Sequence, residues 1–127
     1  MELDYTKNTK KRFDEAVAAI EELTAAKGFR VLHIHDVQST LREKGFEREP
    51  FKIVEICNAK FAHTALGLNE KVALFMPCKI NVYAKGGKTV ISAARPKIIS
   101  EFFSEPKIRD LADDVDAIVR SIVDEAC

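Results

Sequence analysis

The chain lacks an excess of either charge and lacks a long apolar run, and each absence argues against a class of protein. Among 127 residues, 20 Lys and Arg balance 20 Asp and Glu, whereas nucleic-acid-binding proteins usually carry a basic excess or stripe. No apolar run reaches the roughly 18 residues that a transmembrane helix needs. We therefore expect neither a nucleic-acid partner nor a membrane partner.

The sequence also lacks the motifs of secreted, zinc-binding and nucleotide-binding proteins. Its first five residues are acidic and contain no hydrophobic signal segment, so we expect a cytoplasmic protein. The three cysteines include no Cys-x-x-Cys pair and no zinc-ribbon spacing. Thiols in the cytoplasm are normally reduced, which argues against a disulfide scaffold. Walker and Gly-x-Gly-x-x-Gly loops are absent too, so we expect no cofactor and no metal.

Apolar periodicity divides the chain into helices and strands of one domain, residues 1–127. The patterns predict helices over 9–27, 38–44, 58–66 and 105–126. They predict strands over 2–6, 29–36, 51–57, 72–76, 78–84 and 89–92. Strand 51–57 is too apolar for a strand with one solvated face, which places it centrally in its sheet. Gly86-Gly87 predicts a hairpin turn.

The helix ends carry recognisable signals. Asn8 or Thr9 is the expected cap of the first long helix, and Gly28 is its expected C-terminal stop. Ser104 is the expected cap of the last helix, whose wide apolar stripe favours packing on a sheet. Strand and helix segments do not alternate regularly in the second half. This order indicates an α+β fold with a mostly antiparallel sheet and helices on one face.

The two internal cysteines are the residues best placed for chemistry. Cys57 ends an apolar strand and precedes Asn58, the expected cap of a short helix. Partial positive charge at that helix N-terminus would favour a thiolate, and Lys60 and His63 in its first turns would add to the effect. Cys78 follows Pro77 and opens a strand. The candidate site therefore comprises Cys57 and Cys78, with supporting residues Asn58, Lys60, His63, Pro77 and Tyr83.

A structural role for both thiols stays open, because free cysteine often behaves as a small buried hydrophobe. Sequence does not show whether the two Cα atoms fall within the roughly 4.4–6.8 Å that a disulfide needs. Cys127 is the last residue and we expect it to be incidental. His33 and His35 share one strand face, a spacing that permits a metal site but also occurs on solvent-facing strands. Glu55 is expected to be a paired core carboxylate.

Several short segments together resemble a known family. They are Gly28-Phe29, Cys57-Asn58, Met76-Pro77-Cys78, Ile80-Asn81-Val82-Tyr83, Gly86-Gly87 and Pro96. With this pattern the chain resembles the prokaryotic family called domain of unknown function 302. The family usually has Cys-Asn-Pro where this chain has Cys57-Asn58-Ala59, and His33 and His35 lie outside the pattern.

The resemblance implies a fold similar to that of the TATA-binding protein, in the order β-α-β(4)-α: a curved, mostly antiparallel sheet with a long C-terminal helix across it. It does not imply DNA binding, because a fold does not fix a function. Relatives in this family are associated with thiol-redox and sulfur-metabolism proteins, and homodimers are expected of such small domains.

Two functions of different classes follow. The first is a thiol-based protein in which Cys57 and Cys78 cycle between dithiol and disulfide, or carry sulfane sulfur or a soft metal, with a thiol-redox or sulfur-transfer partner. The second is a non-enzymatic module that binds a small apolar ligand between sheet and long helix, or assembles into a homodimer, with structural cysteines. A pocket beneath the long helix would favour the second, and whether the chain is an enzyme stays open.

Overall fold

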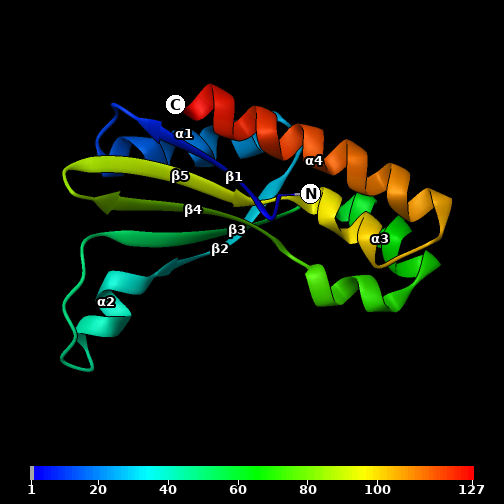
Figure 1. Ribbon diagram of the computed structural model, residues 1–127, viewed down its shortest axis with the longest axis horizontal. Helices are drawn as coiled ribbons and strands as arrows, with labels where there is room; N and C mark the ends of the chain where they lie inside the picture. Colours follow the sequence, from blue (N-terminus) through cyan, green and yellow to red (C-terminus); the bar gives the residue numbers. More distant parts are fainter. Residues whose placement is uncertain (1) are drawn as a thin grey trace.

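Five antiparallel strands form one open sheet in the computed structural model, which describes residues 2–127 (Figure 1). In spatial order they are β1 (Asp4–Thr9), β5 (Lys88–Ala94), β4 (Cys78–Lys85), β3 (Phe51–Cys57) and β2 (Arg30–Asp36). β3 is an inner strand, as predicted, and its two faces are buried to different degrees. Val54 and Ile56 are fully buried, whereas Ile53 on the opposite face is half-buried.

Helices α1 (Phe13–Ala26) and α4 (Pro106–Ala126) cover one face of this sheet (Figure 1). At the N-terminal half of α4 lie α3 (Ala59–Leu68) and two 3₁₀ helices, η1 (Glu70–Phe75) and η2 (Pro96–Glu101). The short α2 (Val37–Arg42) lies beyond the opposite face. This arrangement confirms the predicted α+β class, and the five strands and two long helices follow the predicted β-α-β(4)-α order, with the shorter α2 and α3 inserted between the last four strands. None of the helices within residues 2–127 is long and apolar enough to cross a membrane.

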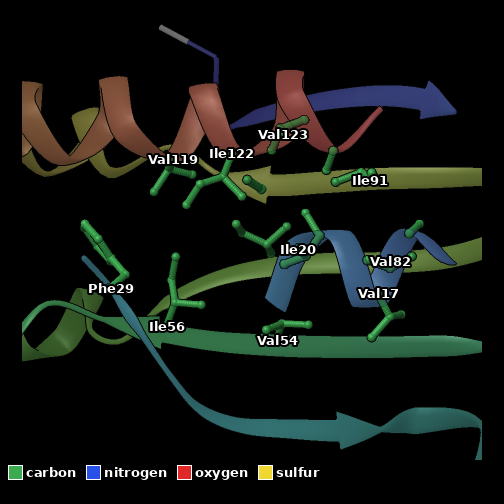
Figure 2. Close-up of a cluster of buried hydrophobic side chains, with 14 residues drawn as sticks. Val17, Ile20, Phe29, Val54, Ile56, Val82, Ile91, Val119, Ile122 and Val123 are labelled. Atoms are coloured by element: carbon green, nitrogen blue, oxygen red, sulfur yellow. The ribbon is translucent and has the colours of Figure 1, made fainter. Parts of the chain in front are cut away.

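The main core lies between the sheet and the two long helices (Figure 2). Its large aliphatic side chains come from two helices and three strands. They are Val17 and Ile20 of α1, Val54 and Ile56 of β3, Ile80 and Val82 of β4, Ile91 of β5, and Val119, Ile122 and Val123 of α4. Each fully buried side chain of this kind contributes about 1.5–3 kcal/mol. The predicted alternation along β4 is confirmed, since Ile80 and Val82 face this core while Asn81 and Tyr83 do not.

The predicted strand over 72–76 is wrong. Residues 70–75 form η1, and Oδ1 of Asn69 accepts a hydrogen bond from the backbone N–H of Lys71 (3.0 Å) at its start. Val72 and Phe75 face inward while Leu74 is 83% exposed. This spacing of three suits a 3₁₀ helix, whose side chains eclipse at that interval. Residues 72–76 are all apolar, so the sequence does not show which of them face inward.

Two predicted helix caps are also wrong. Asn8 and Thr9 belong to β1, which pairs with β5 through both residues, and α1 begins after Arg12. A side-chain oxygen of Glu15 accepts a hydrogen bond from the backbone N–H of Arg12 (3.2 Å) there. Helix α4 begins after Glu105 instead of Ser104. The expected glycine signals hold: Gly28, Gly86 and Gly87 have φ of 80°, 57° and 79°, which only glycine adopts at little cost.

Candidate functional site

An apolar cavity of about 70 Å³ lies beneath the N-terminal half of α4, beside the main core. Its walls come from the ends of β3 and β4 that lie next to each other, from α3, and from η1, η2 and α4. The lining side chains are Phe29, Ile56, Cys57, Asn58, Phe61, Ala62, Ala65, Val72, Phe75, Met76, Pro77, Cys78, Pro96, Ile99, Ile108, Leu111, Ala112 and Val115. Both predicted cysteines therefore line the same cavity.

Strand pairing explains why both cysteines belong to the wall of one cavity. Ile56 of β3 is the Cα partner of Cys78 in β4, so Cys57 lies one residue beyond that pair. All three cysteines of the chain are free, and no disulfide joins Cys57 to Cys78. Both internal thiols are half-buried, whereas Cys127 is exposed at the chain end and does not line the cavity.

Burial keeps both thiols in their neutral form. It raises the pKa of Cys57. It raises the pKa of Cys78 from 9.0 to about 11, with a smaller contribution from the charge on a neighbouring Cys57 thiolate. The direction of the shift at Cys57 is opposite to the predicted stabilisation of its thiolate by the helix N-terminus. The cause of the shift at Cys57 is the loss of hydration on burial.

Asn58 is the only other polar side chain in the wall, and the protein satisfies both ends of its amide. Its Oδ1 accepts a hydrogen bond from the backbone N–H of Phe61 (3.0 Å), which confirms it as the cap of α3. Its Nδ2 donates to the backbone oxygen of Gly28 (2.9 Å). Asn58 thus fixes α3 against the turn before β2.

The remaining predicted residues divide between the wall and the surface. Pro77 lines the cavity. Lys60 and His63 are exposed on α3 and do not line it. Tyr83 lies on the opposite face of the sheet, where its ring stacks on that of Phe51 with centroids 5.0 Å apart. The structure therefore brings together Cys57, Asn58, Pro77 and Cys78, but not the other three.

The histidine pair and Glu55 also lie on the opposite face of the sheet. The rings of His33 and His35 meet edge to face with centroids 4.4 Å apart. Nε2 of His35 lies 3.0 Å from Oε1 of Glu55. Glu55 is therefore paired, but on a half-buried sheet face and not in the core as predicted. Across residues 2–127 no group of three His, Cys, Asp or Glu side chains could hold a metal ion.

Sequence reasoning missed a buried ionic cluster that joins two walls of the cavity. Asp116 of α4 is 1% exposed, and its carboxylate accepts hydrogen bonds from Nη2 of Arg95 (2.8 Å), Nε of Arg120 (3.0 Å) and the backbone N–H of Lys97 (3.2 Å). These contacts tie η2 to α4. The available signal was an aspartate at an inward position of the apolar stripe, next to Val115 and Val119.

The cluster also holds Asp116 ionised. Burial alone raises the pKa of its carboxyl group, but the hydrogen bonds from Arg95 and Lys97 and the charges of Arg95 and Arg120 outweigh burial. The pKa of Asp116 therefore lies below its ordinary value of 3.8. A buried carboxylate with this many donors holds the walls in place and does not act as an acid or base.

Comparison with known proteins identifies the family. The family model described as "Domain of unknown function DUF302" matches residues 5–126. The chain belongs to this family. The crystal structure of the uncharacterised conserved protein DUF302 from Bacillus stearothermophilus is similar to it, with a TM-score of 0.93, 29% sequence identity and 100% of each chain covered. A comparison with curated proteins finds no match.

The segments that carry the resemblance to the DUF302 family concentrate at the cavity. Its wall contains Phe29, Cys57, Asn58, Met76, Pro77, Cys78 and Pro96 from those segments. The other residues of those segments do not line it: Gly28, Ile80, Asn81, Val82, Tyr83, Gly86 and Gly87. The cavity is thus the place where the family pattern and the geometry of this chain coincide.

Proposed function

We propose that the protein is a non-enzymatic binding protein that takes a small apolar ligand in the cavity beneath α4. The observation that carries this proposal is the composition of the wall. Apart from two neutral thiols and an amide that is already hydrogen-bonded, every lining side chain is a hydrocarbon, a proline ring or the thioether of Met76. Ligand sites of this kind gain affinity mainly from apolar burial.

The volume of the cavity limits the ligand to a small group. An engineered apolar cavity of about 150 Å³ is enough to bind benzene, and the present cavity of about 70 Å³ is smaller but open to the surface. A short alkyl chain or the edge of a small ring would enter, with the rest of the molecule outside. Large cofactors do not fit this space.

A pair of substitutions on one helix tests the proposal. Ala112 is 4% exposed and lines the cavity, so Ala112→Leu fills the space. Ala117 lies on the solvent face of α4, so Ala117→Leu adds the same side chain without entering the cavity. Amide chemical shifts are followed by NMR while toluene is added to the wild type and to both variants.

We expect toluene to shift amides around the cavity in the wild type and in Ala117→Leu, and not in Ala112→Leu. Thermal unfolding of each variant establishes that it is folded before the titration. The proposal fails if the wild type shows no saturable shifts, or if Ala112→Leu responds like Ala117→Leu.

A second candidate function is reversible thiol chemistry at Cys57 and Cys78. It is supported by their neighbouring positions on adjacent strands and by their shared cavity. An oxidant such as oxidised glutathione would take two electrons while both thiols release protons to form the disulfide. A thiolate is required for this reaction, and the raised pKa values disfavour it. Peptide mapping after incubation with oxidised glutathione would show whether a Cys57–Cys78 disulfide forms.

Three further proposals concern assembly and location. We infer a homodimer, a thiol-redox or sulfur-transfer partner if the second function holds, and a cytoplasmic location. The stacked Phe51 and Tyr83 on the sheet face away from α1 and α4 support the dimer, because that face is not covered by the long helices. Light scattering during size-exclusion chromatography would measure the mass in solution, and a monomer at all concentrations would rule the dimer out.

A further inference from the structure

A second hollow lies on the sheet face away from α1 and α4. This open-face groove is lined by residues of β3, β4 and β5 together with Leu41 of α2 and residues 47–49, which lie below the strands in Figure 1. Its volume of about 670 Å³ is in the range of small-molecule sites. Within residues 2–127 none lines both this groove and the cavity beneath α4, so the two are separate sites.

Asn81 of β4 supplies the open-face groove with an unused hydrogen-bond acceptor. Among residues 2–127, three buried side-chain oxygens have no hydrogen-bond partner, those of Thr24, Asn81 and Ser100, and of these residues only Asn81 lines the groove. Its cross-strand neighbour Ser92 is already engaged, because the Ser92 hydroxyl lies 2.6 Å from that of Thr6. Asn81 as a whole is half-buried, and its soft χ2 torsion lets the amide turn toward the groove. A buried acceptor without a partner is unfavourable, so a donor from a ligand would satisfy it.

An aromatic surface lies beside this acceptor. Phe51 and Tyr83 are Cα partners in β3 and β4, and their rings stack with centroids 5.0 Å apart and an interplanar angle of 7°. The guanidinium carbon of Arg48 lies 4.9 Å from the centroid of the Phe51 ring. Asn81 and Tyr83 are two residues apart on one face of β4, so their Cα atoms are about 6.5–7 Å apart along the strand. A planar ring system can therefore contact the Tyr83 ring while its edge reaches Asn81.

The charged residues of the open-face groove favour a neutral ligand, and hydrogen bonds fix the segment that carries most of them. Their formal charges sum to zero, from Arg48, Lys85, Glu47 and Glu49. Oε2 of Glu49 accepts a hydrogen bond from the backbone N–H of Gly86 (3.3 Å) in the β4–β5 hairpin. Nε2 of Gln38 in α2 donates to the backbone oxygen of Arg48 (2.9 Å). Residues 47–49 are thus held between α2 and the hairpin, which keeps the groove open beside the sheet.

We propose that the open-face groove binds a neutral, planar aromatic compound with a ring N–H. The ring lies against the Phe51–Tyr83 pair, and its N–H donates a hydrogen bond to Oδ1 of Asn81. This site lies on the other face of the sheet from the cavity beneath α4, so it goes beyond the apolar-ligand function. It also differs in kind, because a directional hydrogen bond selects the ligand in addition to apolar contact.

The test compares indole with 1-methylindole, in which a methyl group replaces the N–H and the ring system is kept. Binding is followed by NMR through the backbone amides of residues 47–49, because they line the open-face groove and not the cavity beneath α4. The variant is Asn81→Leu. Its matched control is Asn8→Leu, because Asn8 is exposed on the same sheet face, in β1, and outside the groove. Thermal unfolding establishes that each variant is folded.

We expect indole to shift these amides saturably in the wild type and in Asn8→Leu. The wild type should bind 1-methylindole about fivefold more weakly, the factor that one net hydrogen bond contributes. Asn81→Leu should lose this preference for indole. The proposal is overturned if the wild type shows no saturable shifts, if it binds both compounds equally, or if Asn81→Leu keeps the preference. A dimer in which a second copy covers this face would leave the amides unshifted and would overturn it too.

The two sites lie on opposite faces of the sheet, so the two proposals can fail separately. Ala112→Leu should abolish the toluene-induced shifts around the cavity beneath α4 and keep the indole-induced shifts of residues 47–49. Asn81→Leu should keep the toluene-induced shifts. A protein that responds to toluene but shows no preference for indole over 1-methylindole retains the apolar-ligand function alone.

Discussion

Cys78 should be the least reactive thiol of the folded protein, and the structure sets the size of the effect. Its pKa is raised from 9.0 to about 11, a difference of two units, so its thiolate fraction at neutral pH is about 100-fold lower than that of an ordinary thiol. A thiolate of higher pKa is also more nucleophilic. With a Brønsted slope of about 0.45, two pKa units raise the rate constant of the thiolate about eightfold. Together the two effects make the reaction of Cys78 at neutral pH about twelvefold slower than that of an ordinary thiol. Shielding by the cavity walls would slow it further.

The assay is reaction with the small disulfide dithiodipyridine, followed by acid quenching and peptide mapping by mass spectrometry. The reference is the same residue in protein unfolded in urea, which removes burial while keeping the sequence. In the folded protein the rate at Cys78 should rise tenfold per pH unit until it levels off near pH 11. In the unfolded protein it should level off near pH 9.

A companion variant separates the two causes of the shift. Cys57→Ser removes the smaller, charge-dependent contribution and should lower the pKa of Cys78 slightly, with burial still holding it above 9.0. A plateau near pH 9 in the folded protein, or equal rates in folded and unfolded protein, would refute the assignment of Cys78 to a water-excluded wall. It would also revive the activated-thiol hypothesis.

Three further predictions concern stability and can be measured by urea or thermal unfolding. Because the folded protein raises the pKa of Cys78, stability should be full below pH 9 and fall between pH 9 and 11, by up to about 2.7 kcal/mol; Cys78→Ala should remove that fall. Asp116→Ala should cost about 3 kcal/mol at neutral pH, because it leaves Arg95 without its buried partner. Since the pKa of Asp116 is lowered in the folded state, this contribution should be present above about pH 4 and disappear as the pH falls further. Asn58→Ala should cost about 1–2 kcal/mol through loss of the α3 cap.

Most elements were predictable because their signals are local. Periodicity located both long helices, and glycines with positive φ marked the end of α1 and the β4–β5 hairpin. Asn58 was predictable as a cap because the bond from its oxygen to the N–H of Phe61 spans only three residues. The predicted strand over 72–76 failed because Val72 and Phe75 face a wall formed by distant residues, and that burial is invisible in a continuous apolar run.

The site was predictable in its members but not in its chemistry. The sequence indicated Cys57 and Cys78, since both stand at element ends. It did not predict that hydrocarbons from α3, η1, η2 and α4 surround them, because those contacts join residues far apart in the chain. Burial raises the pKa of Cys57, and burial is a tertiary property that the local sequence pattern does not contain. Asp116 was missed because its partner Arg95 is 21 residues away.

Polar contacts fix the walls of the cavity relative to one another, which supports a role of the cavity in ligand binding. Asn58 fixes α3 to the turn at Gly28, Nδ2 of Asn69 donates to Oε2 of Glu105 at the start of α4 (3.0 Å), and Asp116 joins η2 to α4. An enclosed void costs about 24 cal/mol per Å³, or about 1.7 kcal/mol for about 70 Å³; because this cavity opens to the surface, its cost is smaller. A larger side chain at Ala112 would fill part of the space, whereas this chain has alanine there and polar contacts that brace the surrounding walls. An empty space contributes nothing to stability, whereas a ligand that binds there stabilises the folded protein.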